Sequence, residues 1–465
     1  MKSIKLSRKT LSFISALLIS SLCGTQYAFS VYSTSVAERL GFSSVQINTI
    51  GSSANYGLFF FGPFFGYIVD TYPSRIIPML ASITIFTGYF CLAMTYQGYF
   101  PNSFLLCVFY LLLTGIASCA AHLSSMGTIS ANIKSYRGIA FGASMALFGL
   151  TAFIFSQINS LFFRGDTYHF LLFTAITTGV FIFIGSIFLV RVPQEESHEE
   201  IISPSEENSS TSSASLNNEE RTPLLSRHEE SDVRGRELFQ NIDAMILGLT
   251  LLLIGGVGLM YMNNVGAIVK SLYLSTSTHP LLIDEEYFSS SLPSDHDLNK
   301  IQEYQNFHVT LLSLFSCSGR ISVGLMSDLS KNMYNVRRLW FLLAASLYIL
   351  IGQILAGFII KDLNHLWISS TFIGFGYGHL FGISPTITNE WFGKIQFVLN
   401  WGIMACFISF GGQLFNLFFG YNFDKHKNDC SGLSCYNTAF YVSTIGSMIS
   451  LCVVSTLLFK RRNQI

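Results

Sequence analysis

An arginine stands inside an otherwise apolar run in the second half of the chain. Arg320 lies within the run 306–327. A charge at this depth costs about 2.5 to 3.5 kcal/mol on insertion scales, so Arg320 should face a water-filled cavity or a partner. Its planar guanidinium matches a carboxylate with two parallel hydrogen bonds, which makes it our candidate anchor for an anion. The alternative is that it reaches the aqueous boundary, or pairs with Asp328 or a backbone carbonyl.

Three histidines also lie within apolar runs and could exchange protons: His122, His308 and His379. A neutral imidazole is cheap to bury, and its ordinary pKa of about 6.5 suits exchange with an acidic compartment. Each could equally be a structural histidine packed between helices. Asn263 could offer hydrogen bonds to a solute, although polar residues in spans often only join helices. Together with Arg320, we take His122, His379 and Asn263 as candidate cavity residues.

The chain lacks the motifs of the common enzyme classes. It contains no phosphate-binding loop, no His-Glu-x-x-His motif, no Cys-x-x-Cys pair and no dinucleotide-binding glycine pattern. His279 and Asp284 form an isolated His-x-x-x-x-Asp, which leaves a membrane acyltransferase as a remote alternative. We expect no enzyme activity, no cofactor and no metal site. Any work that the protein does would then draw on ion or solute gradients.

The composition indicates that a membrane, rather than water, surrounds most of the chain. Hydrophobic residues make up 50% of the 465 residues, charged residues make up 12%, and there are 43 Phe. Soluble domains carry about 25% charged residues. Lys and Arg balance Asp and Glu at 27 each, so no basic field would attract nucleic acid. We therefore expect a polytopic membrane protein.

Twelve apolar runs are long enough to cross a bilayer, since about 20 helical residues span a hydrocarbon core of roughly 30 Å. Backbone groups in lipid must be satisfied internally, which favours helices, and the alternating pattern of barrel strands is absent. The predicted fold class is an all-α membrane protein with twelve transmembrane helices. The expected spans are 11–32, 47–69, 77–96, 103–126, 138–161, 169–190, 242–264, 306–327, 338–360, 366–389, 396–420 and 438–459.

The twelve runs fall into two groups of six. Residues 1–192 and residues 241–465 each hold six runs, and residues 193–240 between them are rich in Glu, Ser and Asn. That segment has almost nothing to bury, so we expect a disordered linker. Lys and Arg are concentrated on the side of the membrane that holds the linker and both termini. This bias predicts that the linker and the termini are cytosolic.

The linker contains a short pattern typical of sorting signals. Residues 220–225, Glu-Arg-Thr-Pro-Leu-Leu, fit the acidic dileucine form Glu-x-x-x-Leu-Leu. Two leucines exposed on a flexible segment would present an apolar plug to a sorting adaptor. Such short motifs also occur by chance. We take Glu220, Leu224 and Leu225 as the predicted sorting residues and the adaptor as a possible partner.

Two cysteines lie outside the predicted spans. Cys430 and Cys435 are in the loop before the last span, on the side opposite to the termini. In an oxidising compartment they could form a local disulfide, and two free thiols are the alternative.

A short motif recurs at the ends of the second and eighth runs. The second run holds Gly66, with Asp70 just after it and Arg75 further on, and the eighth holds Gly324 with Asp328 just after it, at the same spacing. Glycine lets two helices approach closely, while an aspartate at a helix end can cap a neighbouring helix or hold a basic residue. Such a contact can form in one conformation and break in another. Its duplication predicts two related halves.

This motif resembles the loop motif of the major facilitator superfamily, which runs Gly-x-x-x-Asp followed by basic residues. Arg75 fits the last basic position, Pro73 and Ser74 depart from the pattern, and Lys331 is the basic residue near the second copy. Further segments resemble the nodulin-like and monocarboxylate-porter branches: LGFSS, INTIG, residues 137–157 and residues 374–402. The resemblance implies the major facilitator fold, in which two six-helix bundles surround a central cavity that opens alternately to each side.

Within these branches the chain looks most like the fungal monocarboxylate-porter homologues of the vacuolar membrane. In the monocarboxylate porters, the arginine that resembles Arg320 follows by four residues an aspartate that takes part in proton coupling, and this chain has Ser316 there. The resemblance implies a secondary active transporter of a small solute, such as a monocarboxylate, with proton coupling. It also implies a vacuolar, lysosome-like membrane, with the plasma membrane as alternative. The alternative function is a non-transporting sensor with the same fold.

Overall fold

The structure, a computed structural model, describes residues 7–72, 75–133, 135–163, 165–192, 233, 235–277, 295–426 and 432–460. Within these ranges nearly all residues are helical and none forms a strand. The predicted all-α fold class is therefore confirmed.

The first half of the chain forms eight helices and one 3₁₀ segment. Their bounds are α1 (Arg8–Ser20), η1 (Thr25–Val31), α2 (Ser33–Leu40), α3 (Ser44–Phe60), α4 (Gly62–Thr71), α5 (Ile76–Gln97), α6 (Phe104–Asn132), α7 (Arg137–Phe162) and α8 (Thr167–Phe188). The second half begins with the single turn α9 (Gly235–Leu238). It continues with α10 (Ile242–Ser277), α11 (Asp295–Tyr334), α12 (Leu339–Ile354), η2 (Leu355–Ile359), η3 (Leu363–His365), α13 (Leu366–Phe392), α14 (Phe397–His426), η4 (Gly432–Cys435) and α15 (Asn437–Lys460).

Ten helices in the described ranges are long and apolar enough to cross a membrane. They correspond to ten of the twelve predicted spans. The tenth predicted span is α13, whose 27 residues include many Gly, Ser and Thr that lower its hydropathy. The second predicted span is divided into two shorter helices. All twelve runs are thus largely helical, although the first, second and ninth are divided or change helix type and the tenth is less apolar than the other predicted spans.

The second predicted span breaks at Phe61. Helix α3 ends at Phe60, and α4 begins at Gly62 with Pro63 in its first turn. Proline has no backbone N–H and cannot continue the hydrogen bonds of the preceding helix, so the chain bends here. A Cβ on Gly62 would lie 3.1 Å from the carbonyl oxygen of Gly402 in α14. The break therefore lets α4 cross the other half of the molecule at backbone distance.

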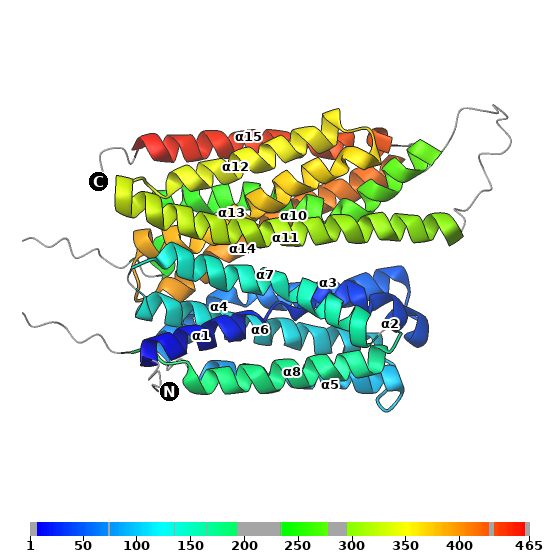
Figure 1. Cartoon of the computed structure of the whole chain (residues 1–465), viewed down its shortest axis with the longest axis horizontal. Helices are drawn as coiled ribbons and strands as arrows, with labels where there is room; N and C mark the ends of the chain where they lie inside the picture. Colours follow the sequence, from blue (N-terminus) through cyan, green and yellow to red (C-terminus); the bar gives the residue numbers. More distant parts are fainter. Residues whose placement is uncertain are drawn as a thin grey trace, which may run out of the picture.

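The two halves lie side by side with their helices roughly parallel to one long direction (Figure 1). Helices α1 to α8 form one half, and α10 to α15 form the other. The halves meet mainly along α7 against α11 and α4 against α14, with further contacts of α7 with α13. The marked chain termini lie at the same end of the molecule (Figure 1). We call this end the terminal end, and the other the opposite end.

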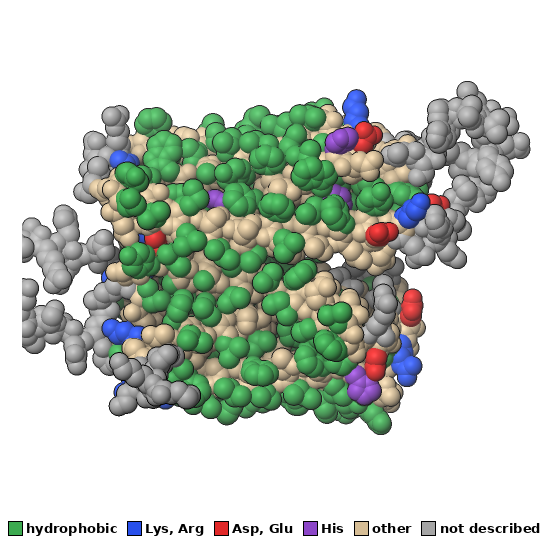
Figure 2. Space-filling model, viewed as in Figure 1, with side chains coloured by type: hydrophobic (Ala, Val, Ile, Leu, Met, Phe, Trp, Pro, Cys, Tyr) green, Lys and Arg blue, Asp and Glu red, His purple; other side chains and the backbone are tan. Residues whose placement is uncertain are grey.

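Hydrophobic side chains cover most of the face that Figure 2 shows, while Lys, Arg, Asp and Glu gather at its two ends. Large apolar residues such as Phe64, Leu105 and Leu161 are more than half exposed. Such a surface is stable in lipid and would aggregate in water. The protein is a multi-pass membrane protein.

Candidate functional site

A cavity of about 230 Å³ lies between the two halves. Its lining comes from η1, α3, α4, α6 and α7 of the first half and from α10, α11, α13 and α14 of the second. Most of the lining is apolar and aromatic. The polar side chains include Tyr27, His122, Asn263, Ser316, Arg320 and Tyr377. Three of the four predicted cavity residues, Arg320, His122 and Asn263, are therefore brought together here.

Arg320 is held in the cavity wall at 6% exposure. Its Nη1 donates a hydrogen bond to the Met145 carbonyl of α7, and its guanidinium lies 5.4 Å from the centre of the Phe381 ring. A methyl group on Gly149 would overlap that guanidinium, so glycine makes the space for it. The backbone carbonyl is one of the partners expected from the sequence. Nε has no hydrogen-bond partner within the described protein.

His122, on α6, is 6% exposed and lies against the ring of Phe148, with ring centroids 4.5 Å apart. Neither of its ring nitrogens has a hydrogen-bond partner within the described protein. The hydroxyl of Ser316, one turn before Arg320, has none either. A buried polar atom without a partner costs about 1 to 3 kcal/mol. Several such atoms around one cavity indicate that a polar solute or water completes their hydrogen bonds.

A second, larger cavity of about 580 Å³ adjoins the first. Both are lined by Tyr27, Met262, Asn263 and Val309. The larger one extends along α10 and the start of α11, towards the opposite end of the molecule, and reaches Lys270. Among the described residues, neither lining contains a carboxylate. The described lining of the two cavities therefore carries only positive or neutral side chains.

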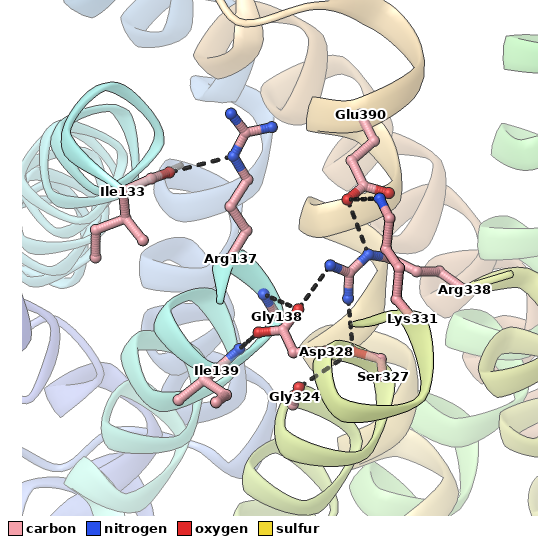
Figure 3. Close-up of polar contacts among 10 residues, drawn as sticks. All are labelled: Ile133, Arg137, Gly138, Ile139, Gly324, Ser327, Asp328, Lys331, Arg338 and Glu390. Carbon is pink, nitrogen blue, oxygen red and sulfur yellow. Dashed lines mark hydrogen bonds and ion pairs between the residues drawn. The ribbon is translucent and has the colours of Figure 1, made fainter. Parts of the chain in front are cut away.

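At the terminal end, the second copy of the repeated motif joins the two halves (Figure 3). Asp328 accepts hydrogen bonds from the backbone N–H groups of Gly138, at 3.0 Å, and Ile139, at 2.8 Å, in the first turn of α7. A carboxylate at a helix N-terminus also interacts favourably with the helix dipole. A Cβ on Gly324 would lie 2.5 Å from the Gly138 carbonyl oxygen, so α11 and α7 cross closely here.

A group of charged residues supports this contact from within the second half (Figure 3). Arg338 donates to Asp328 at 2.6 Å, to Glu390 at 3.0 Å and to the Ser327 hydroxyl at 2.7 Å. Lys331 pairs with Glu390 at 2.7 Å. The basic partner of the second motif is therefore Arg338 rather than Lys331, and Asp328 pairs with this residue rather than with Arg320.

The first copy of the motif makes the matching contact with the halves exchanged. Asp70, in α4, accepts a hydrogen bond of 2.9 Å from the backbone N–H of Leu399 in the first turn of α14. A Cβ on Gly66 would lie 2.6 Å from the Leu399 Cα. Arg75 is exposed at the start of α5, and Arg191 donates to the carbonyl of Val69 at 2.8 Å. Both motifs therefore join the two halves at the terminal end.

The remaining predicted residues lie elsewhere. His379 is buried in α13 against Tyr348 and hydrogen-bonded to the Phe375 carbonyl, outside the two cavities, because its side chain points towards α12. His308 is buried and hydrogen-bonded to Ser370. Cys435 is disulfide-bonded. Cys430 and the sorting residues Glu220, Leu224 and Leu225 lie outside the described residues.

Several residues of this site escaped the sequence analysis. Gly149 and Lys270 carry no signal beyond their residue type, because only the fold brings them to the cavities. Arg338 lies ten residues after Asp328 and just before α12, so a search of the following loop for basic residues could have found it. Glu390, at the end of α13, could not have been paired with it from spacing alone.

Known proteins are similar to this chain in sequence and in fold. A model of the Nodulin-like family matches residues 9–214. The solved structure of the proton:xylose symporter XylE, a major facilitator superfamily protein, bound to 6-bromo-6-deoxy-D-glucose, superposes with a TM-score of 0.63 at 12% identity, covering 97% of this chain and 95% of that one. This chain has the major facilitator fold. The predicted resemblance is thereby confirmed.

Similar sequences extend over nearly the whole chain. The probable transporter MCH1 of Candida albicans is 26% identical, covering 97% of this chain and 92% of the relative. The probable transporter mch1 of Neurospora crassa is 22% identical, covering 94% and 86%. An uncharacterized membrane protein of Saccharomyces cerevisiae, YMR155W, is 24% identical, covering 97% and 95%. With this fold and these relatives, the chain is a membrane transporter and not an enzyme.

Proposed function

We propose that this protein is a secondary active transporter of a small organic anion, such as a monocarboxylate. The observation that carries the proposal is the position of Arg320, a permanent cation in the wall of a central cavity whose described lining holds no carboxylate. An anion bound there would receive charge-assisted hydrogen bonds, which are about twice as strong as neutral ones. The aromatic and aliphatic lining suits the apolar body of such a solute.

The route through the molecule would be alternating access. In the described conformation, Asp70 and Asp328 hold the terminal end closed, and the larger cavity leads towards the opposite end. Opening the terminal end requires both aspartates to leave the helix ends that they cap. The same two halves would then close around Tyr27 and Asn263 at the other end. Symmetric contacts of this kind suit a rocking motion of the two bundles.

We assign the terminal end to the cytosol and the larger cavity to the opposite compartment, on the charge bias of the loops. The dileucine pattern at Leu224 and Leu225 supports a vacuolar membrane. An acidic lumen would then supply the proton gradient.

The test is uptake by the purified protein in sealed vesicles. A labelled panel of pyruvate, lactate, benzoate, a neutral sugar and a quaternary amine would be offered with and without an imposed pH gradient. We expect uptake of one or more of the carboxylates above protein-free vesicles, and none of the amine. Uptake of the sugar or the amine alone would reject the anion assignment, while no uptake at all by folded protein would reject transport of these classes.

A sensor with the same fold is the second candidate, and one contact favours it. Val233, near the end of the linker, donates through its backbone N–H to the Phe392 carbonyl at 3.1 Å, and its carbonyl accepts from the Asn400 side chain at 3.0 Å. This part of the linker is thus attached to the end of α13 and to the first turn of α14, beside the Asp70 contact. Deleting residues 196–230 discriminates the two. A transporter should keep its uptake, whereas a sensor should show no uptake and lose its cellular signal.

A further inference from the structure

His122 is a buried polar group that neither packing nor the fold explains. Both ring nitrogens lack a hydrogen-bond partner within the described protein, although the imidazole is 6% exposed and lines the central cavity. By contrast, the other two buried histidines in apolar spans, His308 and His379, each have a hydrogen-bond partner for one nitrogen. A histidine held without partners in the wall of a solute cavity is placed to bind what enters the cavity.

We propose that the cavity binds the anion together with one proton, and that His122 is the residue that holds the proton. This inference rests on the proposed transport of an anion and names the second ligand of the same site. No bond is made or broken in the solute. The proton enters from the compartment that the cavity faces, sits on an imidazole nitrogen while the anion is bound, and leaves on the other side with it.

The charges that surround His122 determine when it can hold that proton. The elements that line the cavity around it contribute Arg320 from α11, Cys119 from α6, Tyr27 from η1 and Tyr377 from α13. Arg320 is the only permanent charge among these described residues. In the empty cavity the guanidinium repels a second positive charge on His122, and burial adds to the penalty. The imidazole is therefore neutral when the cavity is empty.

A bound anion reverses this balance. Its negative charge lies between Arg320 and His122, so it compensates the guanidinium and attracts the imidazolium at the same time. The empty site holds one cation, the Arg320 guanidinium. The loaded site holds that guanidinium, the His122 imidazolium and one anion, so its net charge is the same as that of the empty site. One proton therefore accompanies each anion. Because linkage is reciprocal, the proton must also strengthen binding of the anion by the same factor. Both ligands would thus load and leave together.

Ser316 and Asn263 complete the pocket without changing its charge. The Ser316 hydroxyl, one turn before Arg320, has no hydrogen-bond partner among the residues that the structure describes and can donate to the anion. Asn263 lies in the lining that the two cavities share. Neither side chain titrates, so they can hold the solute in place but cannot carry the proton. Among the described polar residues around the cavity, His122 alone combines an accessible lone pair with an ordinary pKa near neutrality.

The first experiment uses trifluoroacetate, detected by its fluorine signal, because this acid stays ionised and does not cross the bilayer as a neutral molecule. Vesicles with the wild-type protein and a gradient of one pH unit should accumulate it about tenfold, as one proton per anion requires. His122→Gln keeps the hydrogen-bonding groups but cannot titrate. We expect this variant to lose accumulation driven by the pH gradient while still exchanging internal for external trifluoroacetate, at a lower rate than wild type because the bound anion loses its cationic partner.

His379→Gln is the matched control, since it changes a buried histidine outside the cavity, and it should accumulate the probe as wild type does. Accumulation retained in His122→Gln would overturn the proton assignment and leave anion transport intact. If the wild-type protein neither binds nor exchanges the probe or the carboxylates of the panel, the proposed function fails first.

Should His122→Gln not fold, the wild-type protein provides the second measurement. Trifluoroacetate binding, followed by the fluorescence of Trp401 in the cavity wall, should tighten about tenfold per unit fall in pH. Binding that does not change with pH would overturn the proposal.

Discussion

The contact between Asp328 and α7 yields a prediction whose size follows from the structure. Its carboxylate is 2% exposed and accepts two backbone hydrogen bonds across the halves and one from Arg338. Asp328→Asn removes the charge and leaves one acceptor oxygen for these donors. Only the two backbone hydrogen bonds cross between the halves, and a hydrogen bond to a charged group contributes about 1.5 to 3 kcal/mol, whereas the pair with Arg338 lies within the second half in both the open and the closed state. We expect the closed terminal end to lose about 3 kcal/mol.

A loss of about 3 kcal/mol changes the ratio of open to closed molecules more than 100-fold, so an open fraction of about 1% would become about half. The assay is double electron–electron resonance spectroscopy, which measures the distance between two spin labels. The labels are attached at Tyr72→Cys, in the first half, and Tyr334→Cys, in the second, in a protein whose exposed Cys452 is replaced by serine. Both tyrosines are exposed at the terminal end. In Asp328→Asn, a longer distance between the labels should become a major population.

Asp243→Asn is the matched control for this experiment. Asp243 pairs with Lys460 at 2.7 Å at the same end of the molecule, but both residues belong to the second half. Its substitution removes an ion pair without touching the contact between the halves, so the distance distribution should stay that of wild type. If Asp328→Asn also leaves the distribution unchanged in folded protein, the aspartate does not hold the terminal end closed and our reasoning is refuted.

Three further predictions concern the cavity and the linker. Gly149→Ala should lower uptake about tenfold, because the added methyl displaces the Arg320 guanidinium and overpacking costs about 1 to 3 kcal/mol; wild-type uptake would contradict this placement. Lys270→Gln should raise the KM for a carboxylate a few-fold at low salt with kcat unchanged, since it removes a positive charge from the entrance, and an unchanged KM would remove its guiding role. Replacing Leu224 and Leu225 by alanine should move the protein from the vacuolar to the plasma membrane, and imaging that finds it unmoved would reject the sorting signal.

The fold could be predicted almost completely from the sequence, because lipid leaves few choices. Each apolar run had to become a helix, and the recurrence of Gly-x-x-x-Asp indicated two related halves. What the pattern could not show is the break at Phe61. A proline within an apolar run is compatible with either a kinked helix or two helices, and the close approach of Gly62 to Gly402 decides between them.

The site could be predicted only in part, for a physical reason. The cost of burying a charge singles out Arg320 whatever surrounds it, so the sequence alone indicated a cavity near it. A neutral histidine has no such cost. The sequence therefore could not distinguish His122 from His379. Only the orientation of their helices places His122 in the cavity and packs His379 against Tyr348.

The contacts at the terminal end show the same limit. The motif predicted that an aspartate would cap a helix or hold a basic residue, and Asp328 does both. Arg338 lies within reach of a search of the following loop, but the partner Gly138 could not be named, because it depends on which helices the two halves bring together. Spacing identifies a residue that needs a partner, while tertiary packing decides which partner it finds.

The most direct measurement of the central claim is carboxylate uptake by wild type, Arg320→Gln and Arg320→Lys in matched vesicles. Since Arg320 would hold the anion through its charge and its planar geometry, we predict that Arg320→Gln abolishes uptake and that Arg320→Lys retains a small fraction of it. Carboxylate uptake by folded Arg320→Gln at the wild-type rate would contradict the claim that this arginine binds the transported anion.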